Sequence, residues 1–221
     1  KAFPANMLAA YYSKGCESQE LFAGLAIEKS PAYQKQLNKY DVIHFDVQWC
    51  CKEAGSAEKT VAFISQVLME ELREAYGEYI PEKVTKVSTA LAYISDATGN
   101  RFVIIVDEWD VLIRDESTNK IAQEEYIDFL RSLFKGIEPT RYIALAFMTG
   151  ILPIKKFKTQ SALNNFDEYT MLDSGVLAPY IGFTESEVRV LCEKYHKNFA
   201  EVKRWYDGYQ LGGYHVYNPR A

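Results

Sequence analysis

The chain has 221 residues, of which 48% are hydrophobic and 25% are charged, a composition that is typical of globular proteins and excludes an intrinsically disordered chain. Its 30 acidic residues outnumber its 25 basic residues, and the net charge of −5 argues against direct binding of nucleic acid. No apolar run approaches the roughly 18 to 20 residues that cross a bilayer, so we expect no membrane partner. The four cysteines lack CxxC spacing, which argues against a zinc site and fits a reduced, cytoplasmic setting.

Helices and strands are predicted to alternate as far as residue 150. Apolar residues recur at helical spacing in five segments: 5–13, 20–25, 56–76, 83–97 and 120–134. Strand patterns occur in three segments: 41–49, 102–106 and 142–147. The last two are unbroken apolar runs, as expected of strands covered on both faces of a parallel sheet. The alternation predicts an α/β fold with right-handed crossovers.

Beyond residue 150 the pattern changes. The stretch 161–173 is polar and resembles a loop, and a capping box at Thr184 and Glu187 begins a helix. A short helix over 198–206 is followed by a predicted turn at Asp207-Gly208. We therefore predict two parts, a three-layer α/β core and a small C-terminal helical subdomain, over 1–174 and 175–221.

The strongest motif ends the strand at 102–106. Four or more apolar residues followed by Asp107-Glu108 form the Walker B pattern of P-loop ATPases. A strand brings its last residues to the carboxyl edge of the sheet, where open α/β sheets bind ligands. There Asp107 could hold Mg²⁺ and Glu108 could orient or deprotonate the attacking water. The alternative is a buried strand followed by acidic loop residues.

A polar residue also follows the strand at 142–147. In ATPases of this kind such a residue, beside Walker B, senses the γ-phosphate, and Thr149 is the candidate here. The alternative is a strand-end turn in which Gly150 supplies unusual dihedral angles. We expect Asp107 and Thr149 to lie at the carboxyl ends of neighbouring parallel strands.

The glycine-rich phosphate loop is not found in the sequence. None of the twelve glycines belongs to a GxxxxGK[ST] pattern, and no Gly-Lys pair occurs. The backbone cradle that such a loop provides for phosphates is therefore missing from these residues.

Several segments, in order along nearly the whole chain, resemble the bacterial AAA-ATPase-like family. They are Ala5-Asn-Met-Leu-Ala-Ala-Tyr-Tyr, Glu20-Leu-Phe-Ala-Gly-Leu-Ala-Ile, Val106-Asp-Glu-Trp-Asp, Met148-Thr-Gly, Ser161-Ala-Leu-Asn-Asn, Gly182-Phe-Thr-Glu-Ser-Glu-Val, Trp205-Tyr-Asp-Gly-Tyr and Val216-Tyr-Asn-Pro. The resemblance implies a P-loop NTPase-like sheet that binds and hydrolyses ATP with Mg²⁺. It also implies a following nuclease-like domain, as in many members.

The resemblance assigns roles to three residues, and a fourth departs from the family pattern. Lys1 falls on the P-loop lysine that would reach the β- and γ-phosphates, and Asp107 and Glu108 fall on Walker B. Ala2 departs from the family, which has a Ser or Thr there as a magnesium ligand. We therefore interpret the chain as a fragment truncated before or within the P-loop, which binds ATP weakly or not at all by itself.

A second function class stays open, namely a non-catalytic interaction scaffold derived from an ATPase. Two smaller patterns also have alternatives. Glu201-Val202-Lys203 resembles half of a nuclease motif, but it lies in a helical pattern and suits a solvated helix face better. The aromatic residues around Asp207-Gly208 could stack on a base, and packing within the subdomain is the simpler interpretation. They are Trp205, Tyr206 and Tyr209.

Overall fold

The structure is a computed structural model that describes residues 2–115, 119–154, 163 and 165–217. The chain forms two compact units, Lys1–Asn165 and Phe166–Ala221, and each is described by itself. The domain limits expected near residue 174 stay a prediction. No helix in the described ranges is both long and apolar enough to cross a membrane.

The first unit is built on a parallel sheet. Its strands are β1 (Asp41–Asp46), β2 (Phe102–Asp107) and β3 (Ile143–Met148), in the order β1-β2-β3. Both neighbouring pairs are parallel, and the register places Asp46 opposite Asp107. All six residues of the central strand β2 are buried, as its unbroken apolar run predicts. The expected α/β class with a parallel sheet is therefore confirmed.

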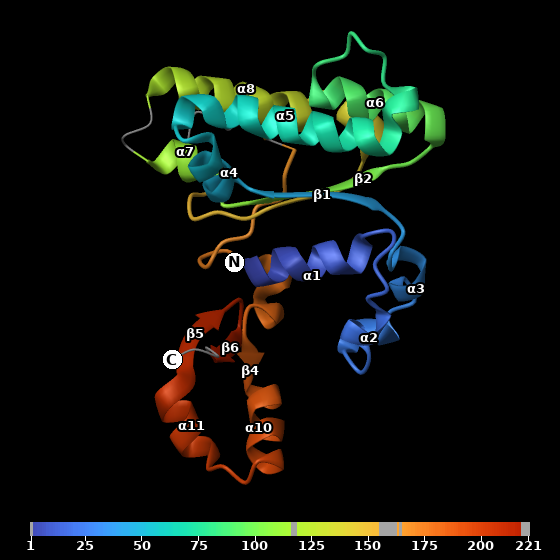
Figure 1. The fold of residues 1–221 in the computed structure, drawn as a ribbon. Coiled ribbons are helices and arrows are strands. Elements are labelled where there is room, and N and C mark those ends of the chain that lie inside the picture. The colour runs from blue at the N-terminus through green and yellow to red at the C-terminus, as the bar shows by residue number, and fades with distance from the viewer. Residues whose placement is uncertain (1, 116–118, 155–162, 164, 218–221) are drawn as a thin grey trace. The chain divides into compact units, whose positions relative to one another are not determined.

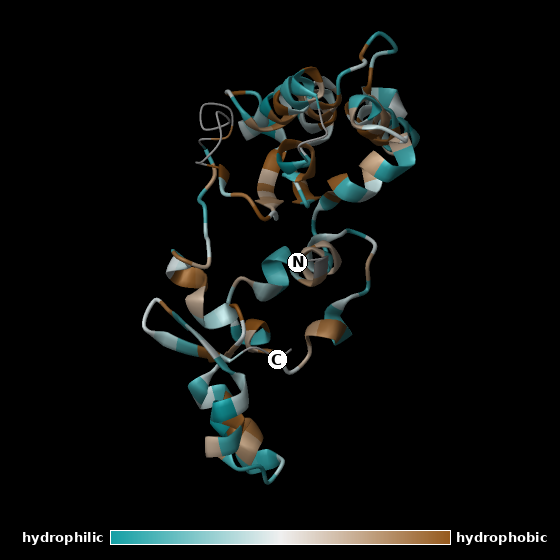
Figure 2. Cartoon of the chain, turned by 90° about the vertical axis from the view of Figure 1, so that its left-hand side faces the viewer, coloured by the Kyte–Doolittle hydropathy of each residue, from teal (hydrophilic) through white to brown (hydrophobic). Residues whose placement is uncertain are grey.

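Helices cover both faces of this sheet (Figure 1). On one side lie the long helices α5 (Ala57–Tyr76), α6 (Val87–Thr98) and α8 (Lys120–Phe134), and on the other side lies α1 (Ala2–Tyr12). Shorter helical segments connect them: α2 (Gln19–Phe22), η1 (Ala26–Lys29), α3 (Tyr33–Gln36), α4 (Val47–Ala54), η2 (Gly77–Tyr79), α7 (Val111–Arg114) and α9 (Pro139–Tyr142). In Figure 2 the strands of the parallel sheet are mostly brown, which marks hydrophobic residues, whereas the helices carry both brown and teal. This is the pattern of amphipathic helices that pack on a buried sheet.

The strand expected over 41–49 is too long. It ends at Asp46, because the Asp46 side chain caps α4 by accepting a hydrogen bond from the backbone N–H of Trp49 at 2.9 Å. A capping aspartate satisfies a backbone donor that has no partner inside the helix, and this outweighs the strand propensity of the apolar residues that follow.

Helix α1 runs antiparallel to the strands. Its carboxyl end is tied to the residue that precedes β1, since Tyr40 N donates to Tyr12 O at 2.9 Å and Lys14 N donates to Tyr40 O at 2.8 Å. Near its amino end Ala5 is buried against Val103 and Ile105 of β2. The amino terminus of α1 is therefore directed toward the carboxyl edge of the sheet.

The second unit is not purely helical, which corrects the expected C-terminal helical subdomain. Besides η5 (Gly175–Tyr180), α10 (Glu185–Lys194) and α11 (Phe199–Tyr206), it contains an antiparallel sheet in the order β4-β6-β5. The strands are β4 (Phe183–Thr184), β5 (Asp207–Leu211) and β6 (Tyr214–Tyr217). The capping box at Thr184 and Glu187 is confirmed.

The hairpin of this unit turns at Gly212-Gly213, not at Asp207-Gly208. Both glycines have positive φ, 52° and 89°, as the central residues of a type I′ hairpin turn do, and glycine adopts these values without steric cost. Asp207-Gly208 belongs to β5 instead, because Asp207 pairs with Tyr217 of the antiparallel strand β6.

Candidate functional site

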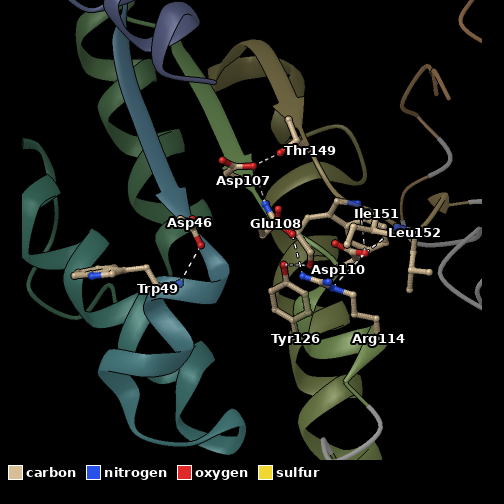
Figure 3. A network of polar contacts seen from close by, with 11 residues as sticks. Asp46, Trp49, Asp107, Glu108, Asp110, Arg114, Tyr126, Thr149, Ile151 and Leu152 are labelled. Carbon is tan, nitrogen blue, oxygen red and sulfur yellow. Dashed lines mark hydrogen bonds and ion pairs between the residues drawn. The ribbon is translucent and has the colours of Figure 1, made fainter. Parts of the chain in front are cut away.

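Two strand-end residues meet at the carboxyl edge of the sheet (Figure 3). Asp107 ends β2 and is 3% exposed, and Thr149 directly follows β3. The Thr149 hydroxyl donates a hydrogen bond to Asp107 Oδ1, which also accepts one from the backbone N–H of Glu108 at 3.0 Å. The placement predicted for these two residues, at the ends of neighbouring parallel strands, is confirmed.

Backbone hydrogen bonds continue past the strands and hold this contact. Thr149 N donates to Val106 O at 2.9 Å, and Trp109 N donates to Thr149 O at 2.9 Å. The ladder between β2 and the chain after β3 therefore extends beyond Met148, and it fixes Thr149 beside Asp107.

Glu108 leaves the strand in the left-handed backbone region, with φ at 50°. For a residue with a Cβ atom this region costs about 1–2 kcal/mol, so the surrounding contacts must enforce it. One such contact is an ion pair in which Arg114 Nη2 lies 2.9 Å from Glu108 Oε2. A turn bond from Val111 N to Glu108 O, at 3.2 Å, is a second.

Asp110 was missed by the sequence analysis, although it lies in the Val106-Asp-Glu-Trp-Asp segment. Its side chain is fully buried, and Oδ2 accepts hydrogen bonds from the backbone N–H groups of Ile151 at 3.1 Å and Leu152 at 2.8 Å. Arg114 Nε lies 3.7 Å from the same oxygen. The only sequence signal for this role is an acidic residue placed close behind a buried strand.

A buried tyrosine supports the same turn. The Tyr126 hydroxyl donates to Trp109 O at 2.6 Å. Burial raises the pKa of Tyr126 well above its ordinary value, and the Asp110 carboxylate raises it further. The hydroxyl therefore stays protonated and remains a donor.

Gly150 is needed for close packing, which corrects the expectation of unusual dihedral angles. It does not belong to the glycines with positive φ. A Cβ atom at this position would lie 2.5 Å from Trp109 Nε1 and 2.7 Å from Asp110 Oδ1. Only glycine lets the chain after Thr149 pass this close to the turn that carries Asp110.

Asp46 brings a further carboxylate to the same edge, and the sequence analysis missed it. It ends β1 in register with Asp107, and its Oδ1 caps α4. In the sequence, the indication of this helix cap is an Asp three residues before Trp49, whose backbone N–H it accepts. The strand predicted over 41–49 includes both residues, so the cap was not predicted.

The donors at this edge fit Mg²⁺ better than a softer metal. Carboxylate and hydroxyl oxygens come from Asp46, Asp107 and Thr149, and hard cations prefer such oxygens. Among the described residues, no three His, Cys, Asp or Glu side chains form a group that could hold a metal ion by themselves. Mg²⁺ is commonly held by one or two protein carboxylates and completes its octahedron with oxygens from water or from a bound ligand, and this donor set suits such an arrangement.

Some of the other predicted residues lie outside the described ranges. They include Lys1 and Ser161. Ala2 begins α1. Glu201 and Lys203 lie on α11, where Lys203 Nζ pairs with Glu185 at 3.2 Å, as a solvated helix face would.

The aromatic residues of the second unit are exposed, so the expectation that they pack its interior is wrong. Trp205, Tyr206 and Tyr209 are 69%, 41% and 53% exposed. Tyr217 and Leu211 fill the interior instead.

Comparisons with known proteins point to one family. A family profile described as "Predicted AAA-ATPase" matches residues 1–159. The chain is also 34% identical over 126 residues to a protein of Azotobacter chroococcum mcd 1 named "Uncharacterized protein in vnfD 5'region". The match covers 56% of the chain and 24% of that protein, so the chain spans about a quarter of the length of this curated relative. No solved structure matches the chain.

Proposed function

The chain belongs to the predicted AAA-ATPase family, and on that premise we propose that the carboxyl edge of its parallel sheet binds and hydrolyses ATP with Mg²⁺. The observation that carries the proposal is the contact between Asp107 and Thr149 at the ends of neighbouring parallel strands. Ligands of open α/β sheets bind outside this edge.

Asp107 is the residue we assign to the metal. Within the described part of the chain, both hydrogen bonds of this side chain go to Oδ1, so Oδ2 is the oxygen assigned to Mg²⁺, directly or through water. When bound, Mg²⁺ would neutralise negative charge on the phosphates. Thr149 orients the carboxylate through its hydroxyl, and we assign it to contact with the γ-phosphate.

Glu108 is the residue we assign to the attacking water, which it would orient or deprotonate. Its ion pair with Arg114 keeps the carboxylate in one place, and a fixed acceptor orients water better than a mobile one. Because the backbone of Glu108 is left-handed, its side chain points in a different direction from the Asp107 side chain.

The phosphates are assigned to the amino terminus of α1. This eleven-residue helix is directed toward the same edge, and a helix amino terminus offers unpaired N–H groups and partial positive charge to anions. Through the family resemblance, Lys1 is the residue that would reach the β- and γ-phosphates. A nuclease-like domain elsewhere in the whole protein also remains a proposal from that resemblance.

The test is ATP hydrolysis and ATP binding by the full-length gene product and two variants. Glu108→Gln should abolish hydrolysis and retain binding, because the amide keeps the shape of the side chain but cannot accept a proton. Asp107→Asn should weaken magnesium-dependent binding. Asp41→Asn is the matched control, because it removes a carboxylate from the opposite end of β1, where Asp41 pairs with Lys14.

Two outcomes would decide against the enzyme. Hydrolysis that is equally fast in Glu108→Gln would remove the assigned role of Glu108. A gene product that binds no ATP would favour the other function class, a non-catalytic scaffold.

A further inference from the structure

We propose that Asp110 and Arg114 are positioning residues that fix Glu108 relative to the chain that follows Thr149. This inference rests on the proposed function and deepens it, because it names side chains that hold the two assigned groups in one geometry. Neither residue reaches the strand ends itself, and each acts through the contacts of another residue.

Asp110 is the anchor of the segment after β3. Its fully buried carboxylate accepts the N–H groups of Ile151 and Leu152, and its Oδ1 lies beside Gly150. A buried carboxylate is costly unless it is paired and hydrogen-bonded, and here two backbone donors and the Arg114 guanidinium meet that requirement. The backbone bonds tie the two residues that follow Gly150 to the turn after β2.

Arg114 connects this anchor to Glu108. Its guanidinium lies 2.9 Å from Glu108 Oε2 through Nη2 and 3.7 Å from Asp110 Oδ2 through Nε. Arg114 Nε and Asp110 Oδ1 are buried and form no hydrogen bond among the described residues. Because Arg114 contacts both carboxylates, a movement of Arg114 toward Asp110 would also move its partner Glu108.

Together these contacts form a second kind of connection between the two strand ends. The first consists of the bonds at the strand ends themselves, from Thr149 N to Val106 O, from Trp109 N to Thr149 O and from the Thr149 hydroxyl to Asp107. The second runs from Glu108 through Arg114 and Asp110 to Ile151 and Leu152. Catalytic groups that shift by about 1 Å can lose on the order of a hundredfold in rate, so a second connection has a measurable consequence.

The first measurement is steady-state ATP hydrolysis by the full-length gene product and its variants. Asp110→Ala and Arg114→Gln should lower kcat by about tenfold or more and change the KM for ATP much less, because positioning is lost and nucleotide contacts are kept. Asp110→Asn should retain more activity than Asp110→Ala, since its amide oxygen still accepts the two backbone bonds. Leu112→Ala is the matched control, because Leu112 is a buried apolar residue of the same turn with no polar contact in the network.

The second measurement is amide hydrogen exchange without nucleotide, which does not depend on hydrolysis. Asp110→Ala should accelerate exchange at Ile151 and Leu152 by at least about tenfold beyond any change in Leu112→Ala, because the two N–H groups lose their acceptor. Asp110→Asn should keep these amides protected, and this variant serves if Asp110→Ala does not fold.

The outcomes separate this inference from the proposed function. If Leu112→Ala lowers kcat as much as Asp110→Ala at equal residual stability, the network is only structural and the inference is overturned. If the wild-type protein hydrolyses no ATP, the proposed function is lost. In that case the hydrogen-exchange measurement alone tests the inference. Unchanged protection of the Ile151 and Leu152 amides in Asp110→Ala would then overturn it.

Discussion

The Thr149 hydroxyl donates a hydrogen bond to the carboxylate of Asp107, although the two residues are 42 positions apart in the chain. The bond joins the ends of two parallel strands, and the Asp107 side chain that receives it is almost completely buried. A buried carboxylate depends on such donors, so this contact matters both for stability and for the geometry of the proposed metal site.

Replacing Thr149 by Val should destabilise the fold. Valine has the same shape but no hydroxyl, so Asp107 keeps only the backbone donor of Glu108. Leaving a buried polar group with one partner fewer costs about 1–3 kcal/mol in the free energy of unfolding. Urea denaturation measures the difference, and Thr149→Ser, which keeps the hydroxyl, should recover most of the stability. Equal stability of Thr149→Val and wild type would contradict the contact.

Replacing Gly150 by Ala should destabilise the first unit by about 1–3 kcal/mol, because the added methyl group overlaps the Trp109 ring and the Asp110 carboxylate. The shift should appear in urea denaturation and in the fluorescence of Trp109, which is 2% exposed. The matched control is Gly77→Ala. Gly77 has φ at −56° and no atom near the added Cβ, so this change should be neutral or stabilising. A neutral Gly150→Ala would show that the turn can move away.

The second unit should lose stability in acid through Glu185. Hydrogen bonds from Arg189 and Lys203 lower the pKa of Glu185 from 4.5 to about 2. Because the folded pKa lies below the unfolded one, the contribution to stability is complete above pH 4.5 and is lost as the pH falls toward about 2. Hydrogen exchange in α10 and α11 across this pH range would measure the loss.

The control for this titration is Glu185→Gln. The amide does not titrate, so the acid-dependent loss of protection in these two helices should become smaller. Glu187, which caps the same helix, remains in both proteins. An unchanged pH dependence in Glu185→Gln would assign the acid response to other groups.

The 221 residues by themselves should bind ATP with Mg²⁺ weakly or not at all. Affinity at such sites depends on successive backbone N–H groups that surround the phosphates, and no GxxxxGK[ST] loop is present to supply them. Titration calorimetry on this chain and on the same chain preceded by a strand and a phosphate loop of the family type should show binding only in the extended protein. Micromolar binding by the 221 residues would contradict the argument.

The amino-acid sequence by itself determined the alternation of helices and strands, the parallel α/β class and the strand-end position of Asp107. These features depend on local patterns, since an unbroken apolar run such as Phe102–Val106 is stable only when a sheet is covered on both faces. The sequence also placed Thr149 behind a neighbouring strand. Parallel strands present their carboxyl ends at one edge, and the two residues therefore met there as predicted.

The tertiary structure alone decided the contacts that no periodicity encodes. Asp46 ends its strand because its side chain caps a helix, and Asp110 is buried because Gly150 lets a distant segment approach it. The ion pair of Arg114 with Glu108 depends on a left-handed turn. Hydrophobic patterns fix which face of an element is buried, but hydrogen bonds between residues far apart in the chain form only where packing brings donor and acceptor within about 3 Å.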